Sequence, residues 1–97
     1  MLRLSFDTTI IEWRGPAPFV FAPVPQQHVA EIERVKRQVS YGWGVVPVEA
    51  EIDGARFTTS LFPRDGGYLL PIKLAVRQQN GITVGDAIAV TMTIGKA

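Results

Sequence analysis

The chain has no cysteine and one histidine among its 97 residues. Both shortages limit the catalytic and metal-binding sites that it can form. Without cysteine there is no disulfide, no thiolate nucleophile and no thiolate metal ligand. A zinc site would need carboxylates for almost all of its ligands, which is unusual for zinc. We therefore expect no metal and no cofactor. The lack of cysteine also agrees with a reducing compartment, which we take to be the cytoplasm.

Long hydrophobic runs and an excess of charge of one sign are missing too. No apolar run approaches the roughly 18 residues of a membrane helix, and the N-terminal MLRLSFD lacks the apolar stretch of a signal peptide. Ten Lys and Arg side chains stand against nine Asp and Glu side chains, which leaves a net charge of +1. Such a chain has no field to concentrate nucleic acid or an anionic membrane. We expect neither a membrane nor duplex DNA as a partner.

The composition is that of one ordinary globular domain, with 46% hydrophobic and 20% charged residues. Alternating apolar and polar residues, bounded by proline and glycine turns, predict the strands. Six strands are expected, over residues 2–13, 19–22, 46–52, 57–61, 68–72 and 88–94. Within the first strand the alternation changes phase at Ile10–Ile11, which indicates a bulge or a bend. Asp53-Gly54 favours a two-residue hairpin turn.

Two segments have helical patterns. The first follows Pro25 and carries an apolar stripe with spacings of three and four residues, formed by Val29, Ile32, Val35 and Val39. The second covers residues 73–80 and ends at Gly81. We expect the first helix to cover one open end of a barrel.

The strands are too closely spaced for helical crossovers, so their pairing should be antiparallel. We therefore predict a mainly β fold, a small closed six-stranded barrel of Greek-key type with two short helices, spanning residues 1–97 as one monomeric domain. The side chains expected to point into the barrel are Val48, Ile52, Leu61, Leu70, Ile88 and Val90.

The C-terminal half carries a set of motifs in a fixed order. These are the valine-rich strand 46–52, the Thr-Ser-Leu-Phe-Pro end of the next strand, Leu70–Arg77 and Gly85-Asp86. In this order they resemble the bacterial family called domain of unknown function nineteen-oh-five. The resemblance implies the same closed barrel and assigns no catalytic residue. Some relatives carry a bacteriocin-protection domain after the barrel, and this chain, which ends at Ala97, is expected to lack it.

A second, fainter resemblance covers Tyr68 to Val90, which is similar to the half-barrel of AbrB-type regulators. That likeness implies a hairpin-swapped dimer that binds DNA through basic residues. This chain is about twice as long as such a half-barrel, long enough to complete the barrel by itself. We therefore keep an AbrB-like nucleic-acid-binding regulator as the alternative to a monomer.

Three aromatic residues at the ends of predicted elements form the first candidate site. Tyr41 and Trp43 alternate with glycines between the first helix and the next strand, and Trp13 with Arg14 ends the first strand. Aromatic rings beside flexible backbone can stack on a ligand or a base. The same rings can instead plug the end of the barrel.

Lys73 and Arg77 form the second candidate site, because a spacing of four places both on one side of a helix. With Arg56 and Arg64 they could make a basic patch for phosphate or nucleic acid. A solvated helix face gives the same pattern. Both helix residues match the family motif, so we keep them as binding candidates.

Two further features have a simpler structural interpretation. His28 has no partner at a recognisable spacing. Glu49, Glu51 and Asp53 could share a proton or hold a metal, but a strand face in water produces the same period of two. We see no catalytic constellation and predict a non-enzymatic binding or interaction module with an unknown partner. A small hydrolase with an unrecognised site is the third hypothesis.

Overall fold

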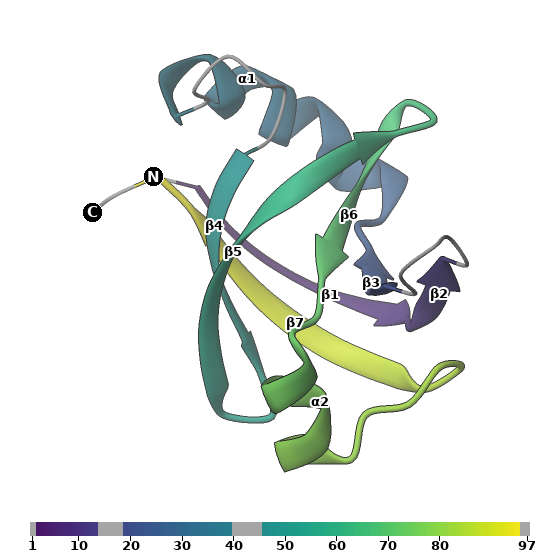
Figure 1. Cartoon of the computed structure of the whole chain (residues 1–97). Coiled ribbons are helices and arrows are strands. Elements are labelled where there is room, and N and C mark those ends of the chain that lie inside the picture. Colours follow the sequence, from purple (N-terminus) through teal and green to yellow (C-terminus); the bar gives the residue numbers. More distant parts are fainter. Residues whose placement is uncertain (1, 14–18, 40–45, 96–97) are drawn as a thin grey trace.

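The computed structural model describes residues 2–13, 19–39 and 46–95. Its strands form one antiparallel sheet in the order β1-β7-β4-β5-β6-β3-β2 (Figure 1). They are β1 (Leu2–Thr9), β2 (Ile11–Trp13), β3 (Phe19–Pro23), β4 (Val46–Ile52), β5 (Ala55–Arg64), β6 (Gly67–Pro71) and β7 (Ala87–Ile94). A 3₁₀ turn (Gln26–His28) leads into α1 (Val29–Val39), and α2 covers Leu74–Asn80. The predicted mainly β fold with two helices is confirmed.

The first strand bends at Ile10, as the sequence indicated. β1 and β2 stand at opposite ends of the strand order, although only Ile10 separates them in the chain. The Ile10 N–H donates to the Asp86 carbonyl (2.9 Å), and the Gly85 N–H donates to the Ile10 carbonyl (2.8 Å). Beside the bend, the Thr8 hydroxyl donates to the Pro23 carbonyl on β3 (2.6 Å). The sheet therefore curls until its two ends meet in one bent strand, and counting β1 with β2 as that strand gives the six that were predicted.

One detail of that bend differs from the prediction. The apolar positions were expected to shift by one residue, so that Ile11 would continue the inner row. Instead Ile10 is 1% exposed and Ile11 is 38% exposed. The bend occurs without a change of phase because the Ile10 backbone bonds to the loop before β7 rather than to a strand.

Two tight turns connect the long central strand to its neighbours. Asp53-Gly54, with φ angles of 50° and 82°, joins β4 to β5, and Asp65-Gly66, with 50° and 78°, joins β5 to β6. Positive φ at both positions is the requirement of a type I′ hairpin. β5 pairs with β4 over residues 55–61 and with β6 over 62–64, so it belongs to both halves of the curled sheet.

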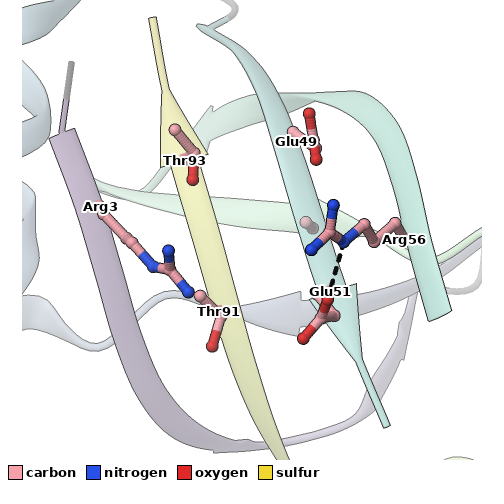
Figure 2. Close-up of a pocket in the computed structure, with 7 residues that line it drawn as sticks. Arg3, Glu49, Glu51, Arg56, Thr91 and Thr93 are labelled. Atoms are coloured by element: carbon pink, nitrogen blue, oxygen red, sulfur yellow. Dashed lines mark hydrogen bonds and ion pairs between the residues drawn. The ribbon is translucent and has the colours of Figure 1, made fainter. Parts of the chain in front are cut away.

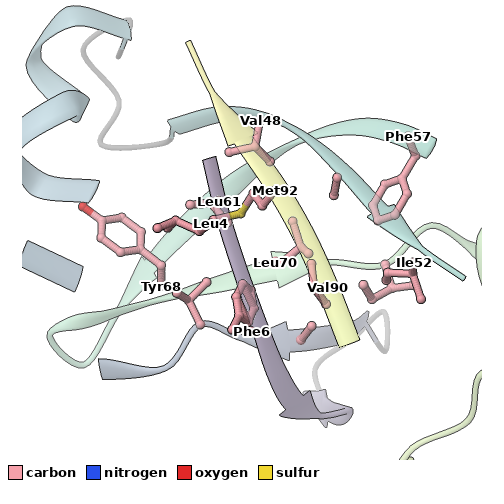
Figure 3. Close-up of a cluster of buried hydrophobic side chains, with 14 of the residues drawn as sticks. Leu4, Phe6, Val48, Ile52, Phe57, Leu61, Tyr68, Leu70, Val90 and Met92 are labelled. Atoms are coloured by element: carbon pink, nitrogen blue, oxygen red, sulfur yellow. The ribbon is translucent and has the colours of Figure 1, made fainter. Parts of the chain in front are cut away.

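The interior of the curled sheet is filled by apolar side chains from β1, β4, β5, β6 and β7 (Figure 3). Five of the six residues predicted to point inward are 5% exposed or less: Val48, Ile52, Leu61, Leu70 and Val90. The sixth, Ile88, is partly buried and packs against the edge of this core. Among the described residues, no charged side chain is buried.

The helix α1 covers one end of the sheet, and α2 lies at the opposite end (Figure 1). Ile32 is fully buried, Val29 is 9% exposed and Val35 packs partly against the core, as the apolar stripe predicted. The Val39 side chain lies outside the described residues. Gly81 ends α2 in the left-handed conformation (φ 62°). Within the described ranges, no helix is long and apolar enough to cross a membrane.

Tyr68 of β6 fastens α1 to the barrel. It is 3% exposed, and its hydroxyl donates a hydrogen bond to the Glu33 carboxylate on α1. The Lys36 ammonium lies 5.9 Å from the centre of the Tyr68 ring. Burial, together with the bond to Glu33, raises the pKa of Tyr68. The contact thus holds the helix by a polar bond at the rim of the apolar stripe.

Candidate binding surfaces

The outer surface around β3 carries a group of aromatic rings. Phe19 and Phe21 alternate along β3 with Val20 and Ala22, which belong to the interior core. Phe21 is 2% exposed but is not part of that core. Its ring centre lies 6.2 Å from that of Phe19 and 6.1 Å from that of Phe62 on β5. These rings form a second apolar cluster, on the outside of the sheet.

The rim of this cluster is open to solvent. Phe19 is 55% exposed, Phe62 is 47% exposed and Ile11, opposite Phe21 in the strand register, is 38% exposed. We call the surface formed by Ile11, Phe19, Phe21 and Phe62 the aromatic face. The Phe21–Phe62 pair is edge-to-face, with an angle of 85° between the rings, an arrangement that aromatic pairs favour. A buried ring is therefore surrounded by exposed ones.

The predicted aromatic site touches this face at one point. Trp13 is the last residue of β2 and stands opposite Phe19 in the register. The Trp13 side chain lies outside the described residues, as do Tyr41, Trp43 and Arg14. The backbone therefore places one of the predicted aromatic residues beside the aromatic face, and the structure does not describe the others.

Sequence reasoning missed Phe19 and Phe62, although the sequence contained a signal for both. Successive strand residues point to opposite faces. When apolar residues follow one another without a break, every second one must therefore lie outside the barrel. This holds for residues 19–22 and for the pair Leu61-Phe62. With Leu61 fully buried, Phe62 has to face outward.

A second surface lies on the outside of β1, β7, β4 and β5. It is a hollow of about 150 Å³. Its polar side chains lie on neighbouring strands (Figure 2) and are Arg3, Glu49, Glu51, Arg56, Thr91 and Thr93. They alternate along their strands with buried residues and therefore face away from the core. We call it the polar hollow. The acidic residues predicted to lie on an outward strand face are confirmed there for Glu49 and Glu51, whereas Asp53 belongs to the hairpin turn.

An ion pair occupies one side of the polar hollow. The Arg56 Nε donates to Glu51 Oε1 at 2.9 Å, because the register of β4 and β5 places these residues opposite each other. This bond, the charge of Glu51 and the charge of Glu49 raise the pKa of Arg56. Both glutamates therefore favour the charged form of this guanidinium.

The predicted four-cation patch is not assembled. Arg56 and Arg64 lie near opposite ends of β5, about 25 Å apart at the rise of an extended strand. Arg56 pairs with Glu51, and Arg64 lies 3.5 Å from Asp65. Lys73, the residue before α2, is exposed, and Arg77 is half-buried with its Nε shielded and unbonded within the described residues.

Two other predicted features have structural roles. His28 packs against the Phe6 ring (5.9 Å between centres) and lies 3.6 Å from the Glu31 carboxylate. Asp86 accepts the Thr83 N–H with its carboxylate at 2.8 Å, so the Gly-Asp motif forms the turn that receives Ile10. In the described ranges, no three carboxylate or imidazole side chains gather as a metal site would require.

The comparisons with known proteins agree with the first resemblance. A family model described as "Domain of unknown function (DUF1905)" matches residues 6–92. No curated protein matches the chain. The similarity to AbrB-type regulators is not shown. Because the matched segment covers nearly the whole chain and contains every strand except the start of β1 and the end of β7, the protein belongs to the DUF1905 family.

Proposed function

We propose that this barrel is a non-catalytic interaction module that binds a protein partner through the aromatic face. The observation that carries the proposal is the cluster of three phenylalanine rings outside the core, with Phe19 and Phe62 about half exposed. Single exposed apolar residues are normal on protein surfaces, but a contiguous aromatic group is typical of an interaction site.

The chemistry of the aromatic face fits a protein rather than a polar metabolite. Aromatic residues are enriched at the centres of protein interfaces, where a few buried rings provide most of the binding energy. Here Phe21 already forms a buried centre, and the exposed rings of Phe19 and Phe62 flank it. Burying the exposed parts of these two rings contributes about 2–3 kcal/mol, enough for a tenfold or larger gain in affinity.

The two exposed rings of the aromatic face, Phe19 and Phe62, lie outside the interior core of the barrel. The strands beside them are already paired. Substitution of these residues should therefore affect binding much more than stability. We propose that the module works in a bacterial cytoplasm, in keeping with its lack of cysteine.

Photo-cross-linking in the source cells tests the proposal. Benzoylphenylalanine placed at position 19 should give a discrete adduct with one partner, and the adduct should disappear when Phe62→Ser is added. The same amino acid at position 58, an exposed residue elsewhere on β5, should give no such adduct. Equal adducts at both positions, or none at position 19, would contradict the proposal. An adduct with a second copy of the chain would replace the monomeric module by a homodimer.

A further inference from the structure

We propose that the polar hollow is a binding site for a small zwitterion, an ω-amino acid whose carboxylate and ammonium groups are joined by a short alkyl chain. This site lies outside β1, β7, β4 and β5, whereas the aromatic face lies on β2, β3 and the far end of β5. The inference therefore does not depend on the proposed protein partner.

The strand register builds the hollow in two rows of side chains. In one row Thr93 of β7 stands between Arg3 of β1 and Glu49 of β4. In the next row Thr91 stands beside Glu51, which in turn faces Arg56. Threonine hydroxyls thus form the middle of the hollow, with charged side chains on both sides of them (Figure 2).

Two of the four charges are available to a ligand. Arg56 is engaged by Glu51 at 2.9 Å. Within the described part of the chain, Arg3 and Glu49 make neither a hydrogen bond nor a close ion pair, although the charge of Glu49 acts on Arg56. A guanidinium and a carboxylate without a bonded partner among the described residues therefore come from the strands on either side of β7, and Figure 2 shows the Arg3 guanidinium beside Thr91.

The charge balance selects the class of ligand. Two arginines and two glutamates sum to zero, so a phosphate would be repelled by the carboxylates and a simple cation by the guanidinium groups. A zwitterion satisfies both charges, with its carboxylate on Arg3 and its ammonium on Glu49.

The spacing of the strands selects the length of the ligand. Arg3 and Glu49 are separated by two inter-strand distances, about 10 Å between their backbones. Both side chains reach into that span, so the room between their charged groups is shorter and suits a molecule no longer than γ-aminobutyrate. Because the charges are exposed to water, we expect a Kd in the range of about 1–10 mM that rises with salt.

Chemical-shift titration at low ionic strength tests this inference with matched ligands. γ-Aminobutyrate should shift the backbone amides of Thr91 and Thr93 in a saturable manner. Butyrate and n-butylamine, which carry only one of the two charges, should each bind at least about fivefold more weakly. Arg3→Gln and Glu49→Gln should each weaken γ-aminobutyrate binding by a similar factor, whereas Arg34→Gln on the exposed side of α1 should leave it unchanged.

The unchanged spectrum of the remaining amides shows that each variant is folded. The comparison of the three ligands on the wild-type protein needs no variant at all. Three results would overturn the inference. They are no saturable shift up to about 20 mM γ-aminobutyrate, an equal response to butyrate or butylamine, and binding by well-folded Arg3→Gln or Glu49→Gln that is as tight as binding by the wild type.

Discussion

Tyr68 shows how one polar bond can be placed at the edge of an apolar core. Its ring packs with the core of the barrel, and its hydroxyl leaves that core to reach Glu33 on α1. The Glu33 carboxylate is on the exposed side of the bond, so the charged partner stays hydrated while the tyrosine is buried. The hydroxyl thereby has a partner that an apolar environment would not supply.

We predict that Tyr68→Phe lowers the free energy of unfolding by about 1–2 kcal/mol, because it removes a hydrogen bond to a charged group and leaves the ring packing unchanged. The folded state raises the pKa of Tyr68 above its ordinary value of 10.0. The contribution of the bond is therefore complete below about pH 10 and is lost as the pH rises toward the folded-state pKa.

Urea unfolding of wild-type protein and Tyr68→Phe at about pH 8 and about pH 11 measures this effect. The difference in stability between the two proteins should shrink at the higher pH. Tyr41 is present in both proteins, so its ionisation cancels. A difference that stays constant or widens would show that burial and the bond to Glu33 do not hold the hydroxyl protonated.

At the scale of elements, the strands and turns could be predicted closely from the sequence because each has a local cause. The β4–β5 hairpin follows from Asp53-Gly54, whose positive φ angles the structure confirms. Gly81 ends α2 because glycine readily adopts the left-handed conformation that closes a helix. The outward direction of Ile11 could not be predicted in this way, since it depends on a non-local bond between Ile10 and the turn at Gly85.

The helix α1 depends on its apolar stripe, and this gives a second prediction. Ile32 is fully buried between α1 and the barrel, so Ile32→Ala should lower the free energy of unfolding by about 2–5 kcal/mol. Leu74→Ala on α2 is the matched control, because Leu74 is 57% exposed and should cost no more than about 0.5 kcal/mol. Denaturant titration of both variants makes the comparison. A loss near zero for Ile32→Ala would mean that the stripe serves a partner and not the fold.

At the scale of the whole molecule, the interior could be predicted and the outer surface only in part. Inward positions follow from alternation, as Val48 and Val90 illustrate. Which outer side chains meet is a property of strand order. That order places Arg3 of β1 beside β7, from the far end of the sequence, with β4 on the other side of β7. Alternation carries no information about that order. For this reason neither the polar hollow nor the aromatic face was predicted as a unit.

The charge distribution gives a third prediction, that the protein does not bind duplex DNA at physiological salt. Counterion release needs several cations converging on the phosphates. Here Arg56 is paired with Glu51, and Arg64 lies at the opposite end of β5 beside Asp65. Fluorescence anisotropy with a labelled duplex should show no binding at micromolar protein. Micromolar or tighter binding with a steep salt dependence, weakened by Arg77→Ala and accompanied by a dimer in light scattering, would favour the AbrB-like alternative.

The central claim is that the exposed rings of the aromatic face form a binding surface outside the folding core. Calorimetry tests it most directly, by titrating the purified partner that cross-linking identifies, free of any cross-link, into wild-type protein, Phe62→Ser and Thr58→Ser. We predict a negative heat-capacity change for the wild type, as expected when apolar surface is buried. Phe62→Ser should bind about tenfold more weakly while its free energy of unfolding stays within about 1 kcal/mol of the wild type. Thr58→Ser should bind like the wild type. Unchanged affinity for Phe62→Ser, or a loss of stability that accounts for its loss of binding, would contradict the claim.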